Sequence, residues 1–517
     1  MQEADYMDSL PGNILSDKKK KWFIAAFVCI NLFLSCYYLD VWITPNSTSR
    51  ALPVITKYED HTISIDKYKD FTGDKSQVNG HYYSDKAPLS TMMVYPFYYV
   101  YKSLGFKDIS EDKLKEYPIY IWETVGLKDG RTFLLPKSSP VFIIGDIICG
   151  AVPFVIIVLI TFLTVVKQRP KFSPVWLAVL PFYGSFLFAY AGTFTGHLLA
   201  GFLLFLGYIL LKEKRLFLAS GIVAGLAFAT EYPIGIIFPI WAVLIYLNEK
   251  DIKKVLLFIA GVAPGVLFAM WYNYHVTGSA VTTSYSYVSN EQYKGVSNIG
   301  FSYPKPEAIW GLLFTRYRGI LIYAPLLIVM GWYVIKQNVK NISNGTKTNF
   351  LILFIKNYFW ITFLFYILLI SANAIWWGGW AFGPRHLIPV TIIVLYEGTV
   401  YLSKISFSKY FFYLLSILGV LAVWVDKSTK IYMLPDNPNQ FALTDVIIPD
   451  FLKHKFNTNL LPVFAFDAPP SLSIYVWPVL FFAGLFFLSQ WYTKLFPAPI
   501  KAATTQQKQA PKKGKRK

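Results

Sequence analysis

A short polar stretch near the start of this chain holds residue types that carry out acid–base and phosphate chemistry. Residues 79–89 read NGHYYSDKAPL and place His81, Asp85 and Lys86 within six positions, beside Tyr83. A lysine ammonium neutralises the charge of a phosphate, and a carboxylate or an imidazole accepts a proton from a hydroxyl group. What these side chains can act on depends on the elements that position them.

The composition of the chain is that of a membrane protein. Of its 517 residues, 55% are hydrophobic and only 15% are charged, whereas a soluble domain has about 25% charged residues. Several apolar runs reach about 20 residues, the length that a helix needs to cross a hydrocarbon core of roughly 30 Å. We therefore expect an all-α integral membrane protein.

Hydropathy predicts about twelve transmembrane helices. Short basic loops alternate with long polar segments, and Lys18–Lys21, Lys167, Lys212 and Lys250 all lie in the short loops. Because lysine and arginine concentrate in cytoplasmic loops, we expect both chain ends in the cytoplasm, and the net charge of +19 requires no nucleic-acid partner. The expected helices cover 22–43, 139–166, 173–191, 195–211, 216–231, 233–248, 255–273, 317–335, 351–372, 387–403, 409–425 and 474–492.

This topology places the chemistry on the outer side of the membrane, which for a bacterial inner membrane is the periplasm. All six histidines lie on or near that side, and histidine is a versatile acid, base and ligand. Glu397 and Asp146 are the carboxylates expected inside helices. The predicted parts are a cytoplasmic segment (1–21), a transmembrane catalytic module (22–403) with outer loop 44–138, a C-terminal transmembrane pair (404–492) with outer loop 426–473, and a basic cytoplasmic tail (493–517).

The first outer loop is expected to carry short interfacial helices and turns. A helix is predicted over 50–58, and the alternation of TISIDKY at 62–68 favours a strand. VNGH at 78–81 is a turn signal. The apolar, aromatic segment 86–105 is expected to lie along the membrane surface. The loop thus places acids and bases at the depth of a lipid phosphate.

Two blocks of the sequence resemble a known superfamily of membrane enzymes. GHYYSDKAP at 80–88 resembles the first-loop signature of the GT-C superfamily, and WWGGWAFGPRHLIPV at 376–390 resembles a second block of that group. TGHLLAGFLLF, ATEYPIG and TRYRGILIYAP also fit its pattern. The nearest branch is similar to the bacterial protein mannosyltransferase and aminoarabinose-transferase-like family. The resemblance covers about residues 44–390 and implies a GT-C type fold.

The resemblance implies roles for residues of the first loop. Lys86 matches the lysine that contacts the lipid phosphate, Asp85 matches the acid before it, and Arg50 matches an arginine that follows an acidic pair. In this chain 46–48 read NST, so that acidic pair is missing. We predict Asp74, as the substitute for that pair, and Asp85 as the catalytic carboxylates. Asp60 and Asp66 are alternatives.

The implied activity is inverting transfer of a sugar from a polyprenyl-phosphate-linked donor to a lipid, glycan or protein acceptor. A carboxylate takes the proton of the acceptor hydroxyl, while Lys86 and Arg385 stabilise the departing phosphate. Trp376, Trp377 and Trp380 are expected in an aromatic belt at the membrane interface. The residues expected to contact the donor are Lys86, Arg50, Tyr83, His81, Arg385, His386, Arg318 and Glu231. For Arg318 the alternative is an anchor of its helix, and for His197 and Glu231 a bond between helices is the alternative to ligand contact.

Other interpretations stay open at this point. A flippase or transporter of a lipid-linked sugar would use the same phosphate contacts without reaction, and a non-catalytic membrane receptor would need no base. No cofactor is predicted with certainty. A divalent metal held by His81, Asp85 and His386 is an option, because imidazole and carboxylate are suitable ligands.

Overall fold

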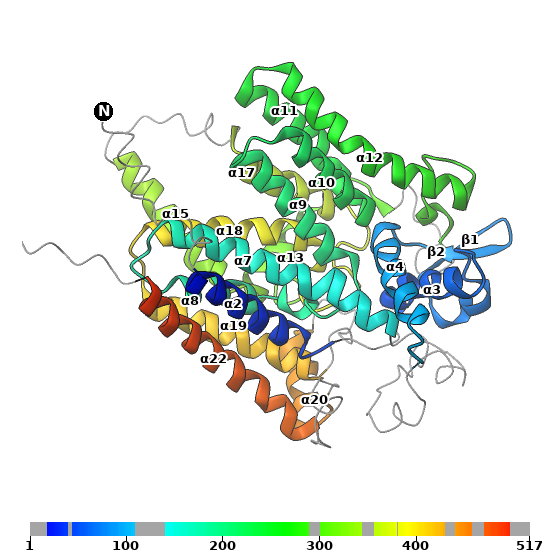
Figure 1. Cartoon of the computed structure of the whole chain (residues 1–517). Helices are drawn as coiled ribbons and strands as arrows, with labels where there is room; N and C mark the ends of the chain where they lie inside the picture. Colours follow the sequence, from blue (N-terminus) through cyan, green and yellow to red (C-terminus); the bar gives the residue numbers. More distant parts are fainter. Residues whose placement is uncertain are drawn as a thin grey trace, which may run out of the picture.

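The computed structural model describes residues 18–39, 44–108, 140–288, 300–343, 356–379, 381–429, 440–456 and 470–496. Helices dominate this part of the chain (Figure 1). Outside the first loop, the elements are α2 (Lys18–Cys36), η3 (Asp146–Ala151), α7 (Val152–Lys167), α8 (Pro174–Tyr183), η4 (Phe188–Tyr190), α9 (Gly196–Lys212), α10 (Phe217–Thr230), η5 (Tyr232–Ile236), α11 (Ile237–Glu249), α12 (Ile252–Thr277), η6 (Ser284–Tyr287), α13 (Pro306–Leu313), α14 (Ile320–Tyr323), α15 (Leu326–Ser343), α17 (Tyr358–Ser371), η9 (Arg385–Leu387), α18 (Ile388–Lys404), α19 (Lys409–Thr429), η10 (Leu443–Ile447), α20 (Ile448–Leu452) and α22 (Pro470–Leu495).

The helices confirm an all-α membrane protein. Within the described ranges, six helices are long and apolar enough to cross a membrane, and five shorter apolar helices accompany them. Each of the twelve expected ranges contains helical residues. However, only six of the described helices are long and apolar enough to span a membrane, so the expected count of about twelve spans is not met. The six long helices are Pro140–Lys167, Tyr232–Glu249, Ile252–Thr277, Arg385–Lys404, Lys409–Thr429 and Ser471–Leu495.

One expected span, 173–191, is broken in the structure. The helix α8 ends at Tyr183, and the chain continues through a turn to the short η4. Gly184 allows this turn to lie against α19, because a Cβ there would be 3.0 Å from the Ser416 carbonyl oxygen. Every residue over 177–201 is buried. Irregular backbone at membrane depth is tolerated where protein covers it in this way.

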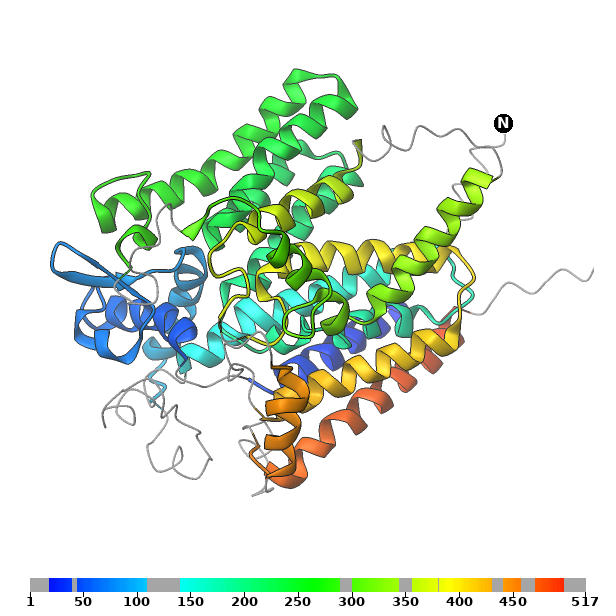
Figure 2. The same cartoon turned by 180° about the vertical axis from the view of Figure 1, so that it is seen from behind.

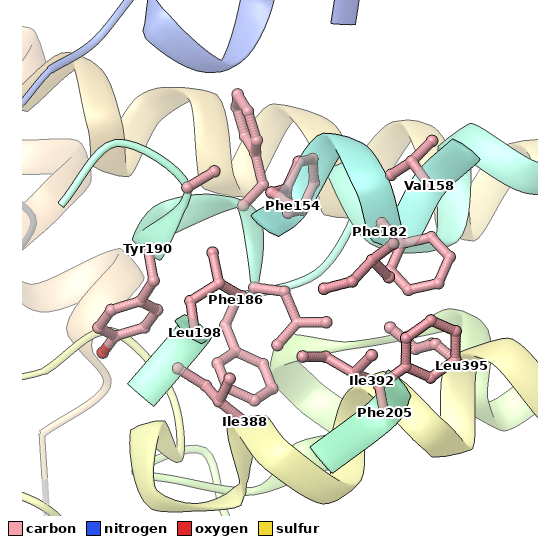
Figure 3. Packing of buried hydrophobic residues seen from close by; sticks show 14 of the residues in the cluster. Phe154, Val158, Phe182, Phe186, Tyr190, Leu198, Phe205, Ile388, Ile392 and Leu395 are labelled. Atoms are coloured by element: carbon pink, nitrogen blue, oxygen red, sulfur yellow. The ribbon is translucent and has the colours of Figure 1, made fainter. Parts of the chain in front are cut away.

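The core is built from α7, α8, α9 and α18. Their apolar side chains interdigitate, with Phe154 and Phe182 on one side of the layer and Phe205 and Ile392 on the other (Figure 3). All four are fully buried. This packing fixes the ends of α9 and α18, which carry candidate site residues.

A second close contact joins α10 to α12. Gly221 and Gly225 face Gly261 and Gly265, and a Cβ at any of these four positions would collide with the partner backbone. Small residues spaced by four are the usual means by which membrane helices approach closely. The pair holds the end of α10 beside the first outer loop.

The first outer loop folds into α3 (Pro45–Glu59), η1 (Asp66–Phe71), the hairpin β1 (Lys75–Val78) and β2 (His81–Ser84), and α4 (Leu89–Ser103). Figures 1 and 2 show these elements together at one end of the helices, in blue. The predicted helix over 50–58 is present and begins earlier, at Pro45.

The predicted turn is confirmed and the predicted strand is wrong. Asn79 and Gly80 both have positive φ, which a tight turn joining two antiparallel strands requires. At 62–68 the chain bends into η1 instead, because Ile65 N–H and the Ser64 hydroxyl both donate to the Tyr82 carbonyl oxygen. These bonds attach the segment to β2 without a regular ladder.

Several expected parts fall partly or wholly outside the described residues. They are most of 1–21, the last third of the first outer loop (109–138), much of 426–473, nearly all of 493–517, and Trp380. Glu397, expected inside a helix, accepts hydrogen bonds from Tyr208 and Lys212 and so links α18 to α9.

Candidate functional site

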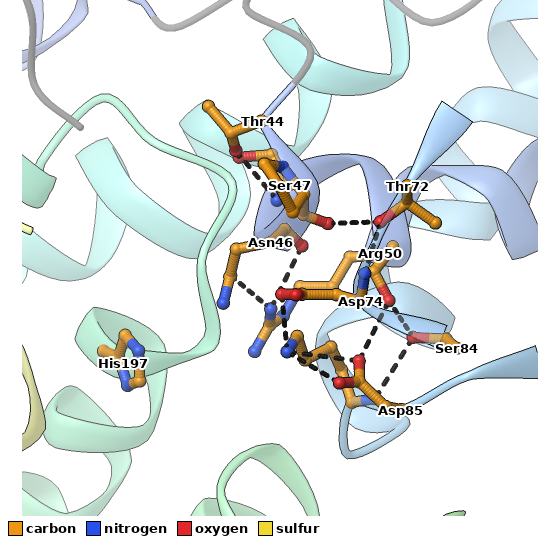
Figure 4. A network of polar contacts seen from close by, with 12 residues as sticks. Thr44, Asn46, Ser47, Arg50, Thr72, Asp74, Ser84, Asp85 and His197 are labelled. Atoms are coloured by element: carbon orange, nitrogen blue, oxygen red, sulfur yellow. Dashed lines mark hydrogen bonds and ion pairs between the residues drawn. The ribbon is translucent and has the colours of Figure 1, made fainter. Parts of the chain in front are cut away.

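Lys86 is the centre of a buried group of charged side chains, here called the Lys86 cluster (Asp74, Asp85, Lys86, Arg50 and Glu231). Its Nζ lies 2.8 Å from Asp74 Oδ2 and 3.1 Å from the Asp85 carboxylate. The Lys86 side chain is 9% exposed. Figure 4 shows the Asp74 and Asp85 carboxylates close to each other, although they come from different parts of the first loop.

Hydroxyl groups of the loop position the two aspartates, Asp74 through its backbone N–H and Asp85 through its carboxylate. Asp74 N–H donates to Thr72 Oγ1, which in turn donates to the Pro45 carbonyl oxygen. Ser49 Oγ donates to Asp85 Oδ1 over 3.2 Å. The start of α3 therefore supports Asp74, and its second turn supports Asp85. The sequence prediction that Asp74 reaches the pocket of Lys86 is met by this geometry.

The electrostatics of the cluster favour an ammonium between carboxylates. Burial lowers the pKa of Lys86, but the attraction of Asp74 and Asp85 outweighs this and raises it. Burial acts to raise the pKa of Asp74, yet Lys86, Arg385 and Arg50 together lower it. Burial and the neighbouring Asp74 raise the pKa of Asp85, against the effect of Lys86. Of the two carboxylates, Asp74 is therefore the one whose ionised form these neighbours favour.

Arg50 joins the loop to the end of α10. Its guanidinium is 3.1 Å from Glu231 Oε1, and it donates to Asn46 Oδ1 over 2.5 Å and to Ser90 Oγ over 3.2 Å. Arg50 is 1% exposed. The structure brings Arg50 and Glu231 into the cluster as expected, but they bind each other. Asn46, where the resembling family has an acid, supplies an amide oxygen to the arginine.

Two histidines meet on the helix side of the cluster. His197, in the first turn of α9, has its Nδ1 3.4 Å from Glu231 Oε1. The His386 ring lies edge-on to the His197 ring, with centroids 5.4 Å apart. Figure 4 shows His197 opposite Arg50 and Asn46. His386 is therefore brought to the site as predicted, and His197 joins it.

Arg385 reaches the cluster from the glycine-rich segment before α18. Gly378 and Gly383 both have positive φ, and a Cβ on Gly378 would be 3.0 Å from Arg385 Cγ. These glycines let the segment fold against the arginine side chain. Arg385 contributes to the lowered pKa of Asp74. Within the described residues, the buried Nε of Arg385 and Nε1 of Trp377 have no hydrogen-bond partner.

Arg318 is not placed to bind a substrate. Its guanidinium is fully buried and donates to the backbone carbonyl oxygens of Trp377, Tyr317 and Gly379 at 2.9, 3.0 and 2.7 Å. A guanidinium is suited to several carbonyls at once, because its five donors form a rigid fork. Arg318 therefore fixes the segment that presents Arg385, which favours the anchoring alternative over contact with the donor.

His81 and Tyr83 lie away from the Lys86 cluster. His81 Nδ1 is 2.7 Å from Asp66 Oδ2, and its side chain is 62% exposed. Both residues line an open polar pocket of about 450 Å³, together with Thr56, Asp60, Thr62, Ser64, Asp66 and Lys67. The alternatives Asp60 and Asp66 thus belong to this second pocket. Alternation along β2 explains the separation, since Ser84 faces inward and His81 outward.

The hypothesis of a metal held by His81, Asp85 and His386 finds no support in the geometry. His81 pairs with Asp66, and Asp85 with Lys86. Across the part of the chain that the structure describes, no group of three or more His, Cys, Asp or Glu residues is arranged to hold a metal ion.

Sequence reasoning missed Tyr285. Its ring centroid lies 5.8 Å from Lys86 Nζ, and η6, which carries it, is attached to the hairpin by the bond from Ser76 Oγ to the Ser284 carbonyl oxygen. No motif identifies this tyrosine, because the contact arises only when the segment after α12 folds over β1.

Comparisons of the chain with protein-family models, curated proteins and solved structures find no significant match. The similarity to the GT-C superfamily therefore stays a prediction from the sequence blocks.

Proposed function

We propose that this protein is a GT-C type glycosyltransferase that moves a sugar from a polyprenyl-phosphate donor to a hydroxyl group at the outer face of the membrane. The observation that carries this proposal is the buried Lys86, held between Asp74 and Asp85, with the charge of Arg385 acting on the same carboxylate. A lysine and an arginine whose charges act on the same carboxylate supply the positive charge that a lipid phosphate requires.

Unpartnered donors in the segment before α18 support an anionic ligand. The Nε of Arg385 and the Nε1 of Trp377 can only donate hydrogen bonds. Each is buried and has no acceptor among the described residues, a situation that costs free energy. Phosphate oxygens would accept from them. In the reaction, Lys86 and Arg385 would stabilise the charge that develops on the departing phosphate.

The arrangement of element ends supports an outer location. The cluster is built where α10 ends, where α9 and η9 begin, and from α3, which follows α2. The alternation of basic loops assigns all of these positions to the outer side. We propose that the shorter apolar helices complete a set of about twelve spans, because a helix surrounded by protein need not cover the full bilayer.

A flippase is the second candidate, and one contact favours it. Arg50 bonds to the Asn46 amide at a position where the resembling family has an acid. A protein that binds a lipid-linked sugar without reaction would not need that acid.

The two candidates differ in what purified protein does in liposomes. The probe is a set of radiolabelled polyprenyl-phosphate sugars, offered with glycan, lipid and peptide acceptors. Under this proposal, sugar moves to an acceptor and free polyprenyl phosphate accumulates. If no acceptor is labelled while the donor crosses between leaflets, the glycosyltransferase proposal is wrong and the flippase replaces it.

A further inference from the structure

The helix side of the site contains a carboxylate–imidazole pair outside the expected set of catalytic residues. His197 Nδ1 lies 3.4 Å from Glu231 Oε1, and the His197 side chain is 7% exposed. Its other ring nitrogen, Nε2, is buried and has no hydrogen-bond partner among the residues described. One ring nitrogen, Nδ1, therefore lies near a carboxylate, and the other, Nε2, is free to bond a substrate.

Backbone and charge fix this pair in place. Glu231 caps the end of α10 and is held by Arg50 from α3 at 3.1 Å. Gly196 precedes His197, and a Cβ on it would collide with Glu231 Oε1 and lie 2.9 Å from Arg50 Nη2. Only glycine at this position lets α9 begin so close to the ion pair.

The pair has the chemistry of an oriented base. A carboxylate at Nδ1 favours the tautomer with the proton on Nδ1, which leaves the lone pair of Nε2 to accept a proton. The same carboxylate then stabilises the imidazolium that forms. Apo structures often show such contacts at long distances that shorten when substrate binds.

Asp74 is poorly suited to the same task. Its carboxylate accepts the Lys86 ammonium at 2.8 Å, and although burial acts to raise its pKa, three nearby cations lower it. The Asp74 oxygen that faces the site is already occupied by the Lys86 ammonium, whereas His197 Nε2 has no partner among the described residues. The position of Asp74 is better explained by holding Lys86 toward the donor phosphate.

We propose that His197 is the base that takes the proton of the acceptor hydroxyl and that Glu231 is its positioning residue. In this step the hydroxyl proton passes to His197 Nε2, and the acceptor oxygen forms a bond to the anomeric carbon. The bond from that carbon to the phosphate oxygen breaks, and its electron pair stays on the phosphate. The inference rests on the proposed function and reassigns its base.

The test is the pH dependence of transfer by His197→Gln in liposomes, with the donors and acceptors named above. We expect transfer to fall about 10²–10⁴-fold, and the ionisation that limits the wild type at low pH to disappear. The rate of transfer by Glu231→Gln should fall less, and the pH at which that ionisation occurs should shift. The charged and titratable groups that face His197 are Glu231 from the end of α10, His386 and Arg385 from η9, Arg50 from α3, and Lys86.

Two measurements keep the result interpretable. Polyprenyl phosphate should bind His197→Gln with wild-type affinity, because the base contacts the acceptor. His275→Gln is the matched control, since His275 is exposed on α12 and bonds only to the Trp271 carbonyl oxygen in the contacts described. It should transfer at the wild-type rate.

Three outcomes would overturn the inference. Full transfer by His197→Gln with an unchanged pH profile would leave the glycosyltransferase proposal standing and remove His197 as the base. Loss of polyprenyl-phosphate binding in that variant would show a structural or donor-binding role instead. If wild-type protein transfers no sugar to any acceptor, the proposed function fails and the inference fails with it.

Discussion

The loop side and the helix side of the site use their polar groups differently. On the loop side, Lys86, Asp74, Asp85 and Arg50 are bonded to one another or to neighbouring protein atoms. On the helix side, His197, Arg385 and Trp377 each have a buried nitrogen without a partner in the described structure. The charged groups of the loop side are therefore already held in place by one another, whereas the helix side has nitrogen atoms that are free to form hydrogen bonds with a substrate.

This difference separates two kinds of functional residue. Groups that are already paired act through their charge and their position, and removing one leaves its partners buried and uncompensated. Groups with unused donors or acceptors act by direct contact with what binds. Substitutions on the two sides should therefore fail in different ways, and three experiments test this, from the largest expected effect to the smallest.

Lys86→Ala should have the largest effect. It removes the cation that holds Asp74 and Asp85 together, so two carboxylates face each other without compensation. We expect a loss of about 10²–10³-fold in sugar transfer and a free energy of unfolding lower by about 3–5 kcal/mol. Transfer in liposomes and thermal unfolding in detergent measure the two effects.

The control for Lys86→Ala is Lys107→Ala, an exposed lysine after α4. It should change neither quantity. A Lys86→Ala protein with normal stability would show that the loop side is not a closed network of charges.

Arg385→Gln should have an intermediate effect, and Arg318→Gln should differ from it in kind. Arg385 has an unpartnered Nε, so its loss should weaken polyprenyl-phosphate binding roughly tenfold, about the 1.4 kcal/mol of one charged contact, with little change in melting temperature. Arg318 holds three backbone carbonyls, so its loss should lower the melting temperature. Lipid titration and thermal unfolding separate the two. An equal fall in melting temperature in both variants would show that Arg385, like Arg318, has a structural role.

Asp66→Asn should have the smallest effect, because Asp66 lies in the second pocket. Transfer should be unchanged at neutral pH. Partial burial acts to raise the pKa of Asp66, but the His81 ring and the Tyr82 N–H lower it. Its stabilising contribution is therefore present above the ordinary pKa of about 3.9 and lost as the pH falls through the lowered value.

Thermal unfolding from pH 7 to pH 3 checks this sign. The wild type should be the more stable protein at pH 7, and the difference should shrink on acidification. A fall in transfer by Asp66→Asn would instead bring the second pocket into the catalytic site.

Helices and turns that depend on local sequence could be predicted, whereas the parts of the fold that depend on tertiary contacts could not. Hydropathy located a helix in each expected range, and Asn79-Gly80 identified the hairpin. The strand expected at 62–68 failed because side chains of Ser64 and Asp66 bond to the backbone of Tyr82. Alternating hydrophobicity does not encode that competition. The break after Tyr183 likewise depends on α19 packing against Gly184.

The candidate site shows the same limit. The DK pair of the quoted stretch indicated Lys86 and Asp85, and a short turn placed Asp74 within reach. His81 and Tyr83 are neighbours in sequence, but strand alternation turns them to another pocket. His197 and Glu231 are 34 positions apart and meet only because α9 and α10 are antiparallel neighbours. No spacing in the sequence reveals that contact.

An experimental structure of the protein with polyprenyl phosphate bound would test the proposed phosphate site. We expect phosphate oxygens at hydrogen-bond distance, about 3 Å, from both Lys86 Nζ and the Arg385 guanidinium, on the side of the cluster that faces His197. A phosphate bound elsewhere, with Lys86 Nζ still paired to Asp74 and Asp85 as it is here, would contradict it.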